Sequence, residues 1–174
     1  FALLPAGAYA LGLALVTNLA VELGFDDSRV GQLTLWTTVL AAAGCVAGGW
    51  LSDRLGRRRM LALFIASMSI PTLWLAWSMS QAGWVMPVSD APGVVRPAAS
   101  AALIATFWWM ALVYSAFNGL MYGTRSALFM DVTTPRVAAT QFTAYMALMN
   151  LTIAYSSNWQ GWAIERWGYP LTLC

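Results

Sequence analysis

The sequence predicts an all-α integral membrane protein, and three observations favour that class. Hydrophobic residues make up 60% of the 174 positions, whereas charged residues make up only 9%. Soluble domains contain roughly 45–50% apolar and about 25% charged residues, so this composition cannot cover a water-facing surface. The apolar residues fall into blocks of about twenty, the length that crosses a hydrocarbon core roughly 30 Å thick. The blocks lack the alternation of barrel strands, which indicates helices.

Five membrane-spanning helices are expected along the chain, separated by polar or turn-forming segments. Their approximate ranges are 1–23, 30–51, 60–77, 101–123 and 140–162. The segment 78–99 holds three prolines and is expected to be an irregular loop. Nothing breaks the helical pattern of the fourth span before Pro135, so its helix is expected to continue to Asp131. The chain begins without Met and ends as a new apolar block opens, so we expect a piece of a longer protein.

Several function classes are disfavoured by the composition. The chain has no histidine, and Cys45 and Cys174 lack the spacing of metal ligands, so neither a metal site nor a cofactor is expected. A net charge of +2 is too small to indicate a nucleic-acid partner. No nucleophile with its base, phosphate-binding loop or acidic cluster occurs at membrane depth, so an enzyme is not expected.

The distribution of arginines predicts the orientation in the membrane. Every second connection carries them, first at Arg54–Arg59 and then at Arg125–Arg136, and the positive-inside rule places both of these loops in the cytoplasm. Tryptophans fall near the opposite interface, as in an aromatic belt. These tryptophans are Trp77, Trp84, Trp159, Trp162 and Trp167.

The segment from Gly49 to Arg59 matches the pattern G-x-x-x-D-R-x-G-R-R-R between two apolar spans. Gly49, like Gly48 before it, allows two helices to approach closely, and Gly56 allows a tight turn. A carboxylate at Asp53 can accept hydrogen bonds from the start of a neighbouring helix. Arg57, Arg58 and Arg59 can bridge to acidic groups such as Asp131. The simpler interpretation is a positively charged anchor for a helical hairpin.

This pattern resembles the cytoplasmic-loop signature of the major facilitator superfamily. The resemblance implies a twelve-helix transporter in which the motif latches the cytoplasmic face closed, with Asp53 and Arg54 as latch residues and Arg57 as the partner of Asp131. It implies conformational roles for the whole gating motif rather than contacts with the solute. That motif comprises Gly49, Asp53, Arg54, Gly56, Arg57, Arg58, Arg59 and Asp131.

The signature alone favours an N-terminal half, but the later sequence favours a C-terminal half. The segments 126–131, 139–151 and 158–162, with A-T-Q-F at 139–142 and the pairs N-L and N-W, are similar to the tenth and eleventh helices of the peptide/acetyl-coenzyme A transporter group. That group includes AmpG-like muropeptide permeases. The resemblance implies that residues 1–174 form five helices of a six-helix C-terminal half, and that a missing N-terminal half completes the transporter.

Polar side chains inside the spans are candidates for the substrate cavity, because such groups are expensive in lipid. Tyr114, Asn118 and Tyr122 recur every four residues on the fourth span, and Asn150 and Asn158 share a face of the fifth. Solute sites of such transporters lie near the midplane, where Asn118 is expected. The alternative is that these side chains form hydrogen bonds between packed helices.

Together these features predict a secondary active transporter in a bacterial inner membrane, working by alternating access on a small-molecule substrate. The expected activity is proton-coupled import of muropeptide-like solutes, and siderophore or acyl-coenzyme A transport is the alternative. A non-transporting membrane receptor or scaffold bundle is the alternative from another class. The coupling residue is expected in the missing half, because Glu22 and Asp131 both lie close to an interface.

Overall fold

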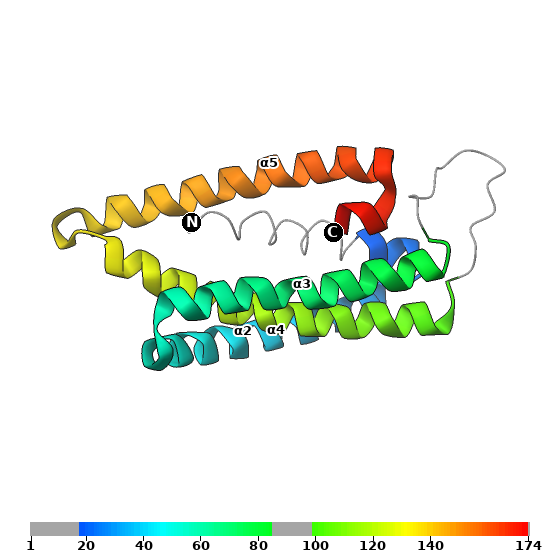
Figure 1. The fold of residues 1–174 in the computed structure, drawn as a ribbon, viewed down its shortest axis with the longest axis horizontal. Coiled ribbons are helices and arrows are strands. Elements are labelled where there is room, and N and C mark those ends of the chain that lie inside the picture. Colours follow the sequence, from blue (N-terminus) through cyan, green and yellow to red (C-terminus); the bar gives the residue numbers. More distant parts are fainter. Residues whose placement is uncertain (1–17, 85–98, 174) are drawn as a thin grey trace.

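The computed structural model describes residues 18–84 and 99–173, and within these ranges the protein is helical and has no strand. A helical segment over 18–22 is followed by α2 (Asp27–Leu55), α3 (Arg57–Gln81), α4 (Ala101–Val132), the short 3-10 helix η1 (Pro135–Val137) and α5 (Ala138–Leu173). Consecutive long helices run in opposite directions, so the α2–α3 and α4–α5 connections lie at the same end of the molecule (Figure 1).

We call that end the arginine end, because it carries Arg54, Arg57, Arg58, Arg59 and Arg136. We call the other end the acidic end. It carries Glu22, Asp26, Asp27 and Glu165. The predicted alternation of the connections is therefore present, although the side of a membrane that each end faces is not a property of the fold.

The helix boundaries follow from local sequence. Asp26 caps α2, because its side chain accepts a hydrogen bond from the Arg29 backbone N–H at 3.1 Å. Ser100 caps α4 in the same way through the Leu103 N–H at 3.2 Å. Gly56 separates α2 from α3 with φ 95°, a left-handed backbone that favours glycine. Thus the tight turn predicted at Gly56 is confirmed.

Helix α5 changes direction near its end. Gly168 has φ 79° and ψ 175°, which interrupts the helix, and Pro170 lies in the turn that follows. The chain becomes helical again beyond this turn. Tyr169 and Leu173 in this last turn are buried in the hydrophobic core.

The core lies mainly between α3 and α4 and is closed at the acidic end by residues 19–25 and the end of α5. Leu61, Phe107 and Met121 are completely buried. Phe25 packs edge-on against Phe107, with ring centroids 5.6 Å apart, and so fixes the start of α2 on α4. Trp84 lies at the acidic end, as predicted, but it is buried in this core and does not face outward.

Helix α2 packs on α4 through small residues. A Cβ atom added to Gly44 would lie 2.6 Å from the Ala116 carbonyl oxygen, and one on Gly48 would collide with the backbone of Leu120. Gly119 and Gly123 of α4 are equally close to the α2 backbone at Ala41 and Cys45. These four glycines, the glycine seam, bring the two backbones together as small-xxx-small pairs do in membrane proteins.

Three of the described helices, α2, α3 and α4, are long and apolar enough to cross a membrane. They contain the predicted second, third and fourth spans. The predicted continuation of the fourth helix to Asp131 is confirmed, because α4 ends at Val132. Most of the predicted first span and most of the loop 78–99 fall outside the described residues. Helix α5 contains the fifth predicted span but is not among the three apolar helices.

Candidate functional site

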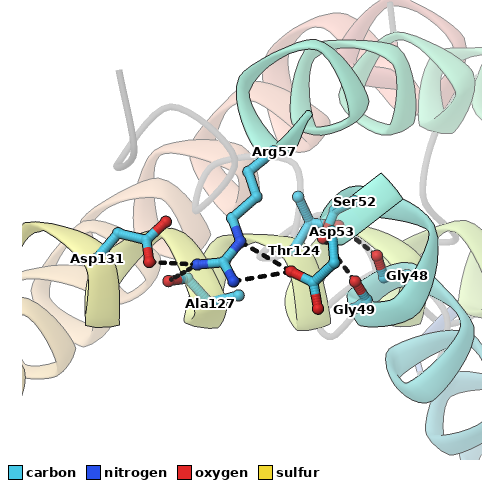
Figure 2. A network of polar contacts seen from close by, with 8 residues as sticks. All are labelled: Gly48, Gly49, Ser52, Asp53, Arg57, Thr124, Ala127 and Asp131. Carbon is cyan, nitrogen blue, oxygen red and sulfur yellow. Dashed lines mark hydrogen bonds and ion pairs between the residues drawn. The ribbon is translucent and has the colours of Figure 1, made fainter. Parts of the chain in front are cut away.

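Arg57 is the centre of a charge cluster at the arginine end (Figure 2). It is the first residue of α3, and its guanidinium contacts groups on both neighbouring helices. Its Nε and Nη2 donate to Oδ1 of Asp53 on α2 at 3.0 and 2.7 Å. Its Nη1 donates to the Ala127 carbonyl of α4 at 3.0 Å and forms an ion pair with Asp131. One side chain therefore joins α2, α3 and α4, and the expected pairing of Arg57 with Asp131 is present.

The two carboxylates of the cluster are open to water. The side chains of Asp53 and Asp131 are 58% and 52% exposed, whereas that of Arg57 is 29% exposed. Exposed ion pairs contribute about 0.2–1 kcal/mol each. Such a cluster can therefore hold three helix ends in register and still be opened by a modest change in free energy.

Within the described residues, Asp53 forms no hydrogen bond to the start of a neighbouring helix. No side chain caps the start of α3, and the Asp53 carboxylate accepts from the Arg57 guanidinium instead. The reason is geometric, because Arg57 lies four residues after Asp53 and the two side chains meet on the same side of the turn.

Beside the cluster, Thr124 of α4 forms a hydrogen bond across the glycine seam (Figure 2). Its hydroxyl lies 3.1 Å from the Gly48 carbonyl of α2 and 3.0 Å from the Leu120 carbonyl of its own helix. Gly48 is the packing residue here. Gly49, where we also expected a close approach, faces no other described helix, because a Cβ there would meet no described atom within 4 Å.

The other motif arginines do not enter the cluster. Arg54 lies over the Trp50 ring, with its guanidinium carbon 4.1 Å from the ring centroid. Arg58 and Arg59 are exposed. Among the motif arginines, the structure thus distinguishes Arg57, which ties helices together, from three that face outward.

The predicted cavity residues occupy different environments. On α4, Tyr114 is buried, Asn118 is partly buried and Tyr122 is 39% exposed. The Asn118 Oδ1 atom is buried and has no hydrogen-bond partner among the described residues. On α5, Asn150 and Asn158 are both exposed. The α4 stripe is therefore a candidate polar lining, whereas the two asparagines are surface residues of the described chain.

Arg125 is not in a loop, contrary to the prediction from its place among the arginines. It lies inside α4, is completely buried and stacks near Tyr122, with 5.0 Å from its guanidinium carbon to the ring centroid. The orientation rule groups Arg125 with Arg136, whereas the helix that we expected to reach Asp131 contains Arg125 and buries it. Of the predicted cytoplasmic segment 125–136, only the part after Val132 is a connection.

One polar contact was not predicted from the sequence. The Tyr169 hydroxyl donates to Oε1 of Glu22 at 2.7 Å, across 147 positions of the chain. Neither residue belongs to a sequence motif. The one feature of the sequence that indicates this contact is the position of Glu22, an acid at the end of an apolar span.

In comparisons with known proteins, no family model, curated protein or solved structure matches this chain. The described residues define a helical protein with three helices able to cross a membrane and a charge cluster that ties them at one end. Function is therefore inferred from these residues and their geometry.

Proposed function

We propose that the chain is most of the C-terminal half of a major facilitator transporter that moves a small solute across a bacterial inner membrane by alternating access. The observation that carries the proposal is the Arg57 cluster. A motif with the spacing of the superfamily signature places its arginine against an acid 74 positions later, on a third helix. A simple hairpin anchor requires positive charge but no such partner.

The strength of the cluster supports a latch. Its ion pairs are exposed, so each contributes at most about 1 kcal/mol. Loss of about 1 kcal/mol changes the equilibrium constant between a closed and an open arginine end roughly five-fold. The polar stripe Tyr114–Asn118–Tyr122 begins deeper in α4 and supplies groups that a solute could contact. The proposed substrates are muropeptide-like solutes, and their import is proposed to be coupled to proton movement.

Uptake by the full-length parent in proteoliposomes tests the proposal, with and without an inward proton gradient. Anhydro-muropeptide, a ferric siderophore and acetyl-coenzyme A are compared as solutes. We expect the parent to take up anhydro-muropeptide only when the proton gradient is present. We expect this uptake to be slower in each of the variants Asp131→Asn, Asp53→Asn and Asn118→Ala. Arg58→Gln is the control, because Arg58 is exposed and outside the cluster.

Uptake of one of the other two solutes instead would keep the transporter and replace the proposed cargo. No uptake of any solute by a folded parent would refute transport of these cargoes and favour a receptor or scaffold. Equal uptake by all the variants would refute the latch.

A further inference from the structure

The hairpin of α2 and α3 carries two matched pairs of an exposed arginine and an exposed tryptophan. On α2, Trp36 and Arg54 are 18 positions apart, and on α3 the same spacing separates Arg59 from Trp77. All four residues are exposed. Eighteen residues make about five turns of an α-helix, so the arginine and the tryptophan of each helix lie on the same face.

The two pairs also lie at matching heights along the hairpin. Helices α2 and α3 run in opposite directions from the turn at Gly56, so both arginines lie at the arginine end and both tryptophans lie toward the acidic end (Figure 1). Five helical turns place the arginine and the tryptophan of each helix about 27 Å apart along the axis. This separation is close to the thickness of a hydrocarbon core, roughly 30 Å.

The two faces between these residues are apolar, and no other described element covers them. The exposed residues of the α2 face are Val39, Ala43, Ala47 and Trp50. Those of the α3 face are Leu63, Ala66, Ile70, Leu73 and Trp74. Indole rings favour the boundary between lipid headgroups and acyl chains, and arginine side chains extend along apolar surface to place their charge among the headgroups. Both faces therefore fit acyl chains, with a polar anchor at each boundary.

The arginines of these faces carry charge that the protein does not neutralise. Within residues 18–84 and 99–173, Arg54, Arg58 and Arg59 form no ion pair, whereas Arg57 pairs with two carboxylates. Arg54 lies over the exposed Trp50 ring, with 4.1 Å from its guanidinium carbon to the ring centroid. A guanidinium that stacks on a ring keeps the N–H groups at its edge for a phosphate. Anionic headgroups are thus attracted to this end and repelled by the carboxylates of the acidic end.

We propose that the outer faces of α2 and α3 bind anionic phospholipids from the leaflet at the arginine end. The lipid phosphates contact Arg54 and Arg59, and the acyl chains lie along the apolar residues that follow on each face. Trp36 and Trp77 lie at the headgroup boundary of the opposite leaflet. The proposal names a partner that the transport function does not specify, and it holds whether or not the chain moves a solute.

Spin labels on the outer faces test their contact with lipid. Ala43→Cys and Ile70→Cys are introduced one at a time into the full-length parent without other cysteines, and each is labelled in a bilayer. Both labels should collide often with oxygen, which dissolves in lipid, and rarely with a water-soluble nickel chelate. Arg136→Cys, in the exposed connection before α5, should show the opposite pattern. Rare collisions with both reagents at the two outer positions would show that protein covers these faces, and would overturn the proposal.

Retention of lipid by the solubilised full-length parent, measured by native mass spectrometry, tests the choice of headgroup. Phosphatidylglycerol and phosphatidylcholine with the same acyl chains are compared, and the parent should retain more phosphatidylglycerol. Arg54→Gln and Arg59→Gln should each lower this preference about five-fold, as expected when one arginine loses an anionic headgroup. Arg29→Gln is the control and should leave the preference unchanged, because Arg29 already pairs with Asp26 at the acidic end.

Soluble glycerol phosphate separates binding of the headgroup from binding of the whole lipid. At a concentration equal to that of the lipid it should not displace phosphatidylglycerol, because it has no acyl chain to occupy the apolar faces. Displacement would overturn the role of these faces. Equal retention of the two lipids by the parent, or a preference that neither arginine variant lowers, would overturn the choice of an anionic partner. Neither measurement requires a solute, so a parent that fails to transport leaves both results valid.

Discussion

At the scale of single residues, two side chains connect distant parts of the chain, and their environments differ. Arg57 makes its contacts in an exposed cluster, where charged groups exchange easily with water. Tyr169 is buried in the core and makes its contact to Glu22 at the edge of that core, where Glu22 is partly buried. The first contact suits a latch that opens, whereas the second holds the first helical segment against the end of α5.

Burial, and then the hydrogen bond to Glu22, raise the pKa of Tyr169 above its ordinary value, which predicts an alkaline transition. The folded protein binds the phenolic proton more tightly than the unfolded chain, whose tyrosines ionise near pH 10. The stabilising contribution is therefore complete below that pH and is lost as the pH rises toward the higher value of the folded state. Absorbance at the tyrosinate band should show one phenol that ionises after the pH range of an ordinary tyrosine. Tyr169→Phe should remove that late component, and Tyr155→Phe, at an exposed position, should keep it.

At the scale of elements, the glycine seam explains how a largely exposed helix is held. The residues of α2 that are buried are Leu33, Gly44, Gly48 and Ser52. Three of these four are small, so α2 is held by close backbone contact and by the Thr124 hydrogen bond rather than by large apolar side chains. The register of α2 on α4, and hence the position of Arg57 beside Asp131, depends on this seam.

Substitutions in the seam test this dependence. Gly48→Ala places a methyl group against the Leu120 backbone, which cannot move away as a flexible side chain would. The expected loss is about 1–3 kcal/mol, seen as a lower melting temperature in detergent. Gly49→Ala, one position along the same helix, meets open space. It should leave stability unchanged or raise it by up to about 1 kcal/mol through helix propensity. Equal melting temperatures for the two variants would contradict the role of the seam.

The elements were more predictable from the sequence than their contacts. Apolar block lengths predict α2, α3 and α4, and the motif spacing predicts the turn at Gly56. The continuation of α4 to Asp131 was predicted, but the burial of Arg125 inside it was not, because an arginine next to other arginines of a connection is expected to face water. The Glu22–Tyr169 contact could not be predicted, since it requires knowing how the turn after Gly168 folds back.

At the scale of the whole molecule, the two ends differ in charge and in the kind of tie that holds them. The arginine end holds α2, α3 and α4 together through ion pairs, and the acidic end holds segment 18–22 to α5 through a partly buried hydrogen bond. In the proposed transporter, each end opens in a different step. Breaking the arginine tie should then change access to the middle of α4 from that side only.

Labelling of one cysteine from the arginine side tests the latch most directly. The experiment starts from a full-length parent without cysteines, in which this chain carries Cys45→Ala and Cys174→Ser. Asn118→Cys is then introduced as the single cysteine. A membrane-impermeant maleimide is then applied to inside-out vesicles. Adding Asp131→Asn should speed the labelling by about five-fold, because the lost ion pair shifts the balance toward the open state. Adding Asp26→Asn, at the acidic end, should leave the rate unchanged. A labelling rate that Asp131→Asn does not alter would contradict the claim that Arg57 and Asp131 hold this face closed.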